Sequence, residues 1–155
     1  MKILFTNARI LTMKDNEPIF EGSLLVDGNK IVHLGKELPK GKVDRIIDCK
    51  GNVLMPGFKN AHAHSAMTFT RSFADDLELQ EWLFNCIFPL EAKLEAEDQY
   101  ILSKVAILEY LTSGITACFD MYYNPLEMAK ASIDTGFRTV LLGTVTKFRE
   151  SVEEM

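Results

Sequence analysis

The sequence predicts an α/β protein in which a short all-β segment precedes alternating strands and helices. Residues 2–52 consist of short apolar runs separated by polar turns, with no helical period between them. From residue 53 onward, apolar runs alternate with helical stretches, a pattern typical of parallel βα units. We therefore expect two domains, with residues 1–52 as part of a small β-sandwich and residues 53–155 as βα units.

The first domain contains four strand-like runs, at residues 3–6, 9–12, 22–26 and 46–48. Asp27-Gly28, followed by the apolar Ile31-Val32, predicts a tight hairpin, because glycine accepts the positive φ that such turns require. His33 lies in this segment, far in sequence from the other two histidines. We interpret it as a structural residue.

The second domain is expected to begin with a strand at residues 53–64. A helix at residues 77–88 would be capped by Asp75 or Asp76 and ended by Pro89. The elements that follow are a helix at 96–112, a strand at 115–121, a helix at 125–135, a strand at 138–145 and a charged tail at 147–155. The helix at 96–112 has an apolar stripe at helical spacing, a pattern typical of a side that faces a core. It is formed by Ile101, Val105, Leu108 and Leu111 and widened by Leu102 and Ala106.

The composition excludes several classes of function. Seventeen basic and 22 acidic residues give a net charge of −5, which argues against nucleic acid or an anionic membrane surface as partner. No apolar run approaches the ~20 residues of a membrane span, and the N-terminus does not resemble a secretory signal. Cys49, Cys86 and Cys118 have neither metal-ligand nor disulfide-framework spacing, so a reduced, cytoplasmic setting is expected.

His62 and His64 are the candidate metal ligands. Side chains two residues apart on a strand point to the same face, so both imidazoles could converge on one ion. Histidines also occur at this spacing by chance, and the pair alone is a weak signal. The end of a buried parallel strand, however, is where barrel enzymes place their chemistry.

The residues around this pair resemble the first-strand metal motif of the amidohydrolase superfamily. The resemblance lies in Pro56-Gly57-Phe58, Asn60, His62 and His64. Downstream runs are similar to the branch that holds the methylthioadenosine/S-adenosylhomocysteine deaminases and chlorohydrolase-like enzymes. These runs are Ser65-Ala66-Met67-Thr68, Arg71-Ser72-Phe73-Ala74-Asp75-Asp76-Leu77, Glu81-Trp82-Leu83-Phe84, Pro89-Leu90-Glu91 and Asp120-Met121-Tyr122.

The resemblance implies a (β/α)₈ TIM-type barrel, a fold of about 250 residues. Only about 100 residues follow Gly57, enough for the first two to three βα units. The resemblance further implies that His62 and His64 bind Zn²⁺, or another divalent ion, that lowers the pKa of a water. The remaining ligands and the general acid would come from later strands, so no catalytic residue is assigned in this chain, and we expect the isolated chain to be inactive.

Two further residues are candidates for substrate binding by this resemblance. Glu91 matches a carboxylate that holds ribose hydroxyls, although the residue alone reads equally as a solvated acid at a helix start. Trp82 could wall a purine pocket or pack as a core aromatic. Asp120 is interpreted as a buried structural acid. Gly143 stands where the branch has a substrate-binding arginine, with Arg149 six residues further on, which leaves the nucleoside's 5′ group open.

These expectations favour hydrolytic deamination of an adenosine-type nucleoside: methylthioadenosine, S-adenosylhomocysteine or a 5′-deoxyadenosine-like compound. A related guanine-type or triazine-type amino- or chlorohydrolase is the first alternative. A non-catalytic truncated product that self-associates is the second, because an open part-barrel would expose apolar edges. Under each hypothesis a homo-oligomer or a complementary fragment is the expected macromolecular partner.

Overall fold

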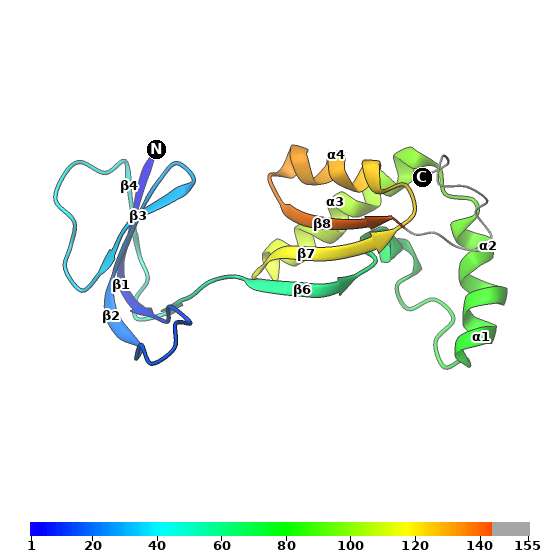
Figure 1. The fold of residues 1–155 in the computed structure, drawn as a ribbon, viewed down its shortest axis with the longest axis horizontal. Helices are drawn as coiled ribbons and strands as arrows, with labels where there is room; N and C mark the ends of the chain where they lie inside the picture. The colour runs from blue at the N-terminus through cyan, green and yellow to red at the C-terminus, as the bar shows by residue number, and fades with distance from the viewer. Residues whose placement is uncertain (144–155) are drawn as a thin grey trace. The chain divides into compact units, whose positions relative to one another are not determined.

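The computed structural model describes residues 1–143 and divides into two compact units that meet between Pro56 and Gly57. The first unit is all-β, and strands and helices alternate in the second (Figure 1). The predicted α/β class is therefore confirmed. The last two residues of the strand expected at 138–145, and the charged tail at 147–155, lie outside the described residues.

The first unit is a single sheet. Its strands are β1 (Lys2–Ile10), β2 (Phe20–Asp27), β3 (Lys30–Gly35), β4 (Arg45–Asp48) and β5 (Val53–Leu54). They lie in the order β3-β2-β1-β4. The short strand β5 pairs with Arg9 and Ile10 of β1, further along β1 than the residues that pair with β4. Because the described residues of this unit form one sheet, the second layer of the expected sandwich stays a prediction.

Local sequence accounts for two features of this sheet. The runs predicted at 3–6 and 9–12 are one strand, which bulges between Phe5 and Ala8, where Asn7 has a φ of 52°. The predicted hairpin is confirmed, with Asp27 opposite Lys30 and Gly28 at a φ of 60°. His33 contacts the Glu37 carbonyl through Nε2 at 2.8 Å, in agreement with a structural role.

The single strand predicted at 53–64 is wrong, because two strands occupy these residues. β5 pairs with β1 in the first unit, whereas β6 (Phe58–Ala63) pairs with β7 in the second. Pro56 lacks a donor to continue a ladder. Gly57 lies against Thr116 so closely that an added Cβ would be 2.2 Å from the Thr116 methyl. The Pro56-Gly57 pair, which separates the two strands, therefore also lies at the boundary between the two units.

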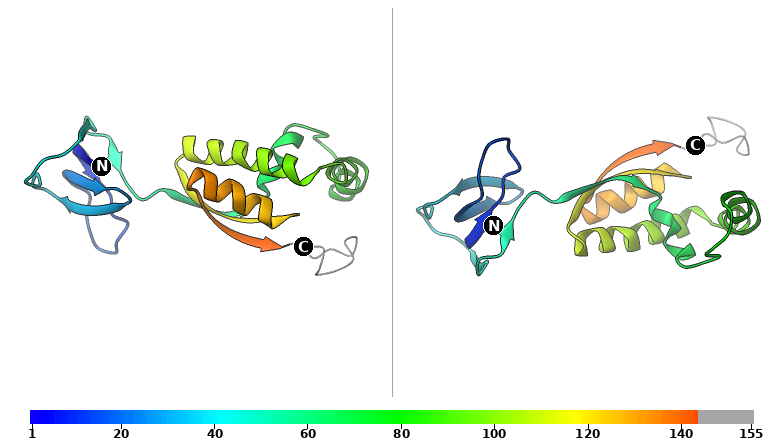
Figure 2. Two further views of the ribbon diagram at one scale, coloured as in Figure 1. Left: turned by 90° about the horizontal axis from the view of Figure 1, so that it is seen from above. Right: turned by 90° about the horizontal axis from the view of Figure 1, so that it is seen from below.

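The second unit is built on a parallel sheet in the order β6-β7-β8, with β7 at Ile115–Tyr122 and β8 at Arg138–Gly143. Two helices, α3 (Ala96–Thr112) and α4 (Pro125–Thr135), lie side by side over one face of this sheet (Figure 2). The core lies between these layers and is formed by Ala63, Ile107, Cys118, Met128, Ala131 and Phe137.

α3 has the predicted bounds, but most of its predicted apolar stripe does not face the core. The four central stripe residues are exposed, with Leu108 at 62%, whereas Ala106, which widens the stripe, is 2% exposed. The buried side of the helix carries Gln99, Ser103, Ala106 and Ile107, of which Ile107 belongs to the core cluster. Helical spacing shows where an apolar stripe lies, but not which side of the helix the rest of the unit covers.

The helix predicted at 77–88 is longer and irregular. It runs without interruption through α1 (Leu79–Glu81), a π-helical turn η2 (Trp82–Ile87) and α2 (Phe88–Glu91). Pro89 therefore does not end it. The Phe88 N–H bonds the Leu83 carbonyl five residues back, and this widened turn accommodates a residue that has no N–H of its own.

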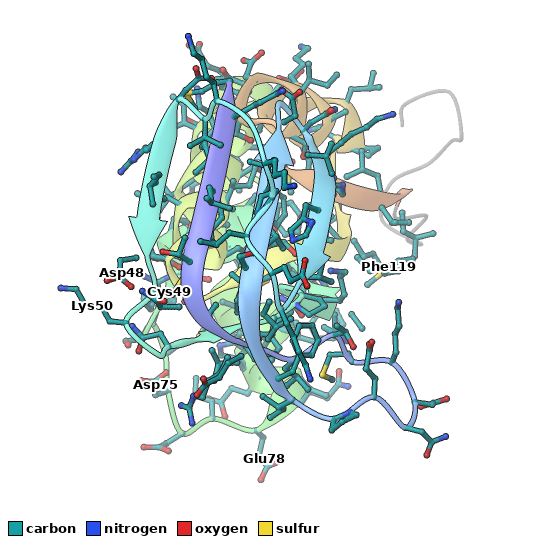
Figure 3. The ribbon with its side chains drawn as sticks, turned by 90° about the vertical axis from the view of Figure 1, so that its left-hand side faces the viewer. Asp48, Cys49, Lys50, Asp75, Glu78 and Phe119 are labelled. Carbon is teal, nitrogen blue, oxygen red and sulfur yellow. The ribbon has the colours of Figure 1, made fainter. Side chains whose placement is uncertain are left out.

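The predicted N-cap is also wrong. Glu78 precedes the first helical residue, and no side chain caps that end. Asp75 and Glu78 point away from the chain into solvent (Figure 3). All three cysteines are free thiols, and Cys49 lies in the turn after β4 beside Asp48 and Lys50 (Figure 3). Within residues 1–143, no helix is long and apolar enough to cross a membrane.

Candidate functional site

His62 and His64 converge at the C-terminal end of β6. Their Nε2 atoms lie 3.1 Å apart, and the ring planes are nearly perpendicular at 89°. His64 Nδ1 lies 2.7 Å from the Met121 carbonyl at the end of the neighbouring strand β7. A carbonyl only accepts hydrogen bonds, so Nδ1 carries a proton, and in the neutral ring the lone pair is on Nε2.

This geometry suits a metal ion. Two nitrogen ligands of one tetrahedral zinc lie ~3.3 Å apart, given Zn–N bonds of about 2.0–2.1 Å. The observed Nε2 separation of 3.1 Å is close to this value. A carbonyl that fixes the tautomer of a ligand histidine is the usual outer-shell arrangement of such sites. Among the described residues, however, no group of three histidine, cysteine, aspartate or glutamate side chains is placed to hold an ion.

A cavity of about 310 Å³ opens beside His64. It lies between the end of β7, the turn after β6 and the irregular helix α1–η2–α2. Its walls are mostly apolar or aromatic and consist of His64, Met67, Trp82, Leu83, Ile87, Phe88, Glu91, Met121, Tyr122 and Tyr123. The volume is at the lower end of the range for small-molecule sites. The structure thus brings Trp82 and Glu91 into one cavity with His64, whereas His62 contacts His64 but does not line the cavity.

Glu91 is buried, with only 5% of its surface exposed. Its Oε1 accepts a hydrogen bond of 2.7 Å from the hydroxyl of Tyr122. The interpretation of Glu91 as a solvated acid at a helix start is therefore wrong. The reason is that the helix continues through Pro89 and carries Glu91 at its last turn, against β7.

Asp120 is also buried, at 2% exposure, as predicted for a structural acid. Its Oδ1 accepts from the Ser65 backbone N–H at 3.1 Å, and Oδ2 has no hydrogen-bond partner among the described residues. Burial raises the pKa of this carboxyl, an effect opposed by hydrogen bonding from Ser65. Asp120 thus holds the start of η1 (Ser65–Thr70), directly after the histidine pair.

Sequence reasoning assigned roles to His64, Trp82 and Glu91 but to none of the other seven residues that line the cavity, among them Met67, Tyr122 and Tyr123. Tyr122 follows Asp120-Met121 at the end of a strand, where functional residues of parallel sheets gather, and that position was the available signal. Gly143 pairs with Tyr122 in the sheet, so its position lies one strand away from the cavity wall. Arg149 lies outside the described residues.

Comparison with known proteins identifies relatives over most of the chain. The amidohydrolase family model matches residues 53–154. A 5-methylthioadenosine/S-adenosylhomocysteine deaminase of Syntrophomonas wolfei is 46% identical over 91% of this chain and 33% of its own length. A 5′-deoxyadenosine deaminase of Methanosarcina acetivorans is 45% identical over 90% of this chain and 32% of its own length. The chain therefore spans about a third of the length of these curated relatives.

Solved structures of two further proteins match the fold. An adenosine deaminase from Xanthomonas campestris with bound zinc has a TM-score of 0.81 and 29% identity, covering 89% of this chain and 33% of that chain. A triazine hydrolase from Arthrobacter aurescens has a TM-score of 0.82 and 25% identity, covering 99% of this chain and 40% of that chain. Together with the family match over two thirds of the sequence, these similarities show that the chain belongs to the amidohydrolase family.

Proposed function

We propose that this chain forms the N-terminal portion of a metal-dependent hydrolase that deaminates an adenosine-type nucleoside. The observation that carries the proposal is the shared cavity, in which His64, Trp82 and Glu91 meet although they are distant in sequence. The names of the two curated relatives, both deaminases of adenosine-type compounds, support this substrate class.

In this proposal His62 and His64 would contribute two ligands to a zinc ion, or another divalent ion, through their Nε2 atoms. When bound, such an ion supplies a water whose pKa is lowered towards neutrality. The Met121 carbonyl keeps the His64 ring oriented, with Nδ1 as its hydrogen-bond donor and Nε2 as the nitrogen turned towards the ion. Glu91 would accept hydrogen bonds from the sugar hydroxyls, and Trp82 would stack against or border the base.

The apolar lining supports a ligand with a large uncharged part. Besides Trp82, seven of the ten lining residues are aliphatic, thioether or aromatic, and their only polar side-chain groups are the hydroxyls of the two tyrosines. These residues are Met67, Leu83, Ile87, Phe88, Met121, Tyr122 and Tyr123. Such walls exclude water and favour a flat heterocycle over a highly charged substrate. A purine nucleoside combines this heterocycle with the hydroxyls that a carboxylate can bind.

A guanine-type or triazine-type amino- or chlorohydrolase is the second candidate. The similarity to the triazine hydrolase from Arthrobacter aurescens favours it, because the match extends over nearly the whole chain. Glu91 favours the nucleoside instead, because triazines carry no sugar hydroxyls for a buried carboxylate to accept from.

We further infer that the site is completed by residues outside positions 1–143. The described residues offer two ligands, whereas a catalytic zinc site needs about three. One face of the sheet carries exposed apolar side chains at Phe119, Val140 and Leu142, which suits a continuing barrel, a complementary fragment or a second copy. Size-exclusion chromatography of the 155-residue chain would distinguish a monomer from these associations.

The test compares the 155-residue chain with the complete protein that carries this sequence, each loaded with zinc. Both are assayed for ammonia release from adenosine, 5′-deoxyadenosine, methylthioadenosine, S-adenosylhomocysteine and guanine, and for chloride release from chlorinated triazines. We expect the complete protein to deaminate at least one adenosine-type nucleoside and the 155-residue chain to be inactive. Turnover of guanine or triazines alone would favour the second candidate, and robust turnover by the short chain would refute the proposed incompleteness.

A further inference from the structure

The end of β7 holds two groups of the cavity at once through consecutive residues. The Met121 carbonyl accepts a hydrogen bond from His64 Nδ1 at 2.7 Å. The Tyr122 hydroxyl donates to Glu91 Oε1, also at 2.7 Å. Because β7 is the central strand of the sheet, paired on both sides, its end is a rigid reference for both groups.

The bond between Tyr122 and Glu91 is of a strong type. Both side chains are buried, at 9% and 5% exposure, and a phenol that donates to a carboxylate at this distance is a charge-assisted hydrogen bond. The two residues lie 31 positions apart and on different elements, so the bond joins α2 to the sheet. A carboxylate that would otherwise rotate about its last side-chain bond is held in one orientation.

We propose that Tyr122 is a positioning residue, whose hydroxyl orients the Glu91 carboxylate to accept the vicinal 2′- and 3′-hydroxyls of a nucleoside. This inference rests on the proposed function, since it assigns Glu91 to the sugar. The bond from Tyr122 to Glu91 and the contact between Met121 and His64 both start at the end of β7. Together they fix the distance between the metal-binding imidazoles and the sugar-binding acid. Tyr122 acts through Glu91 and need not touch the substrate itself.

The experiment uses the complete protein that carries this sequence and the variant Tyr122→Phe, which removes only the hydroxyl. Binding of adenosine and of 2′,3′-dideoxyadenosine is measured by calorimetry on the metal-free protein, so the readout does not depend on turnover. We expect the parent to prefer adenosine, and the variant to lose about tenfold in adenosine affinity, the size expected for a hydrogen bond to a charged group. Its affinity for the dideoxynucleoside should change little.

Tyr100→Phe is the matched control. Tyr100 also donates its hydroxyl to a carboxylate, Asp134 Oδ2 at 2.5 Å, but it does not line the cavity. We expect this variant to keep the parent's ratio of the two affinities. In a Glu91→Gln background, Tyr122→Phe should cause no further loss of adenosine affinity, because the two residues act as a unit.

Three results would overturn the inference: a parent that binds both nucleosides equally, a Tyr122→Phe variant that matches the parent, or one that weakens both nucleosides equally. The last would indicate a merely structural hydroxyl. Failure of the proposed function is separate, because it would appear as absent ammonia release by the zinc-loaded parent. If the binding pattern is as expected without ammonia release, the positioning role stands and the deaminase proposal falls.

Discussion

The regions around Glu91 and Asp120 contain the same chemistry in different surroundings. Both carboxylates are buried, at 5% and 2% exposure, and both accept a hydrogen bond. Glu91 lines the cavity and bonds a side-chain hydroxyl, whereas Asp120 is not among the lining residues and bonds the Ser65 backbone. The difference teaches that burial alone does not distinguish a candidate substrate-binding acid from a structural one. Access to a cavity and the kind of partner separate the two roles.

The largest effect should come from His64, which belongs to the cavity region and also lies within the electrostatic reach of Asp120. We expect His64→Ala to remove zinc binding by the complete protein, a loss larger than the about 10–100-fold caused by changing an outer-shell partner. Zinc content by atomic absorption is the measurement. His33→Ala is the control, because His33 lies in the first unit, where it contacts the Glu37 backbone carbonyl. Full zinc occupancy in His64→Ala would contradict the assignment of the pair.

The next effect concerns the cavity carboxylate. Glu91→Gln should raise KM for an adenosine-type nucleoside about tenfold. The amide has one acceptor oxygen in place of two, and this oxygen accepts less strongly and is also the partner of the Tyr122 hydroxyl. Steady-state kinetics on the complete protein test this, with Asp120→Asn as the comparison. If Asp120→Asn changed KM as much as Glu91→Gln, the distinction between the two regions would be lost.

Asp120 should instead affect stability in a pH-dependent way. Because burial raises the pKa of Asp120, the folded state binds more protons than the unfolded chain at pH values between the ordinary pKa of 3.8 and the higher pKa of the folded state. The free energy of unfolding therefore falls as pH rises through this window, and the cost is complete above the folded pKa. Asp120→Asn has no such dependence, so its stability relative to the parent should grow from below pH 3.8 towards neutrality. Urea denaturation with a metal chelator measures this, and parallel curves for both proteins would refute it.

The smallest effect should come from Tyr110, which bonds the Ser65 hydroxyl at 2.9 Å on the Asp120 side of the molecule. Tyr110→Phe should lower the free energy of unfolding by about 0.5–1.5 kcal/mol, the usual range for one hydrogen bond, and leave KM unchanged. Urea denaturation and steady-state kinetics together test the pair of claims. A change in KM comparable to that of Glu91→Gln would show that the Asp120 region also shapes the cavity.

Much of the second unit could be predicted locally. The helices at 96–112 and 125–135 have the predicted bounds. A capping box of Glu95 and Asp98 begins the first, and Pro125 and Gly136 mark the two ends of the second. The convergence of His62 and His64 follows from the two-residue repeat of a strand. The helix predicted to end at residue 88 continues to Glu91, because the π-helical turn before Pro89 accommodates the missing N–H of that proline.

The sequence by itself determined the helices at 96–112 and 125–135, the strand between them and the convergence of the histidine pair, since each depends on neighbours within a few residues. Only the tertiary structure decided which side of α3 is buried, that Glu91 leaves solvent, and that Tyr122 holds it. These outcomes depend on contacts between elements that are distant along the chain. The free energy of such contacts comes from surfaces that meet only after folding, so no local pattern encodes them.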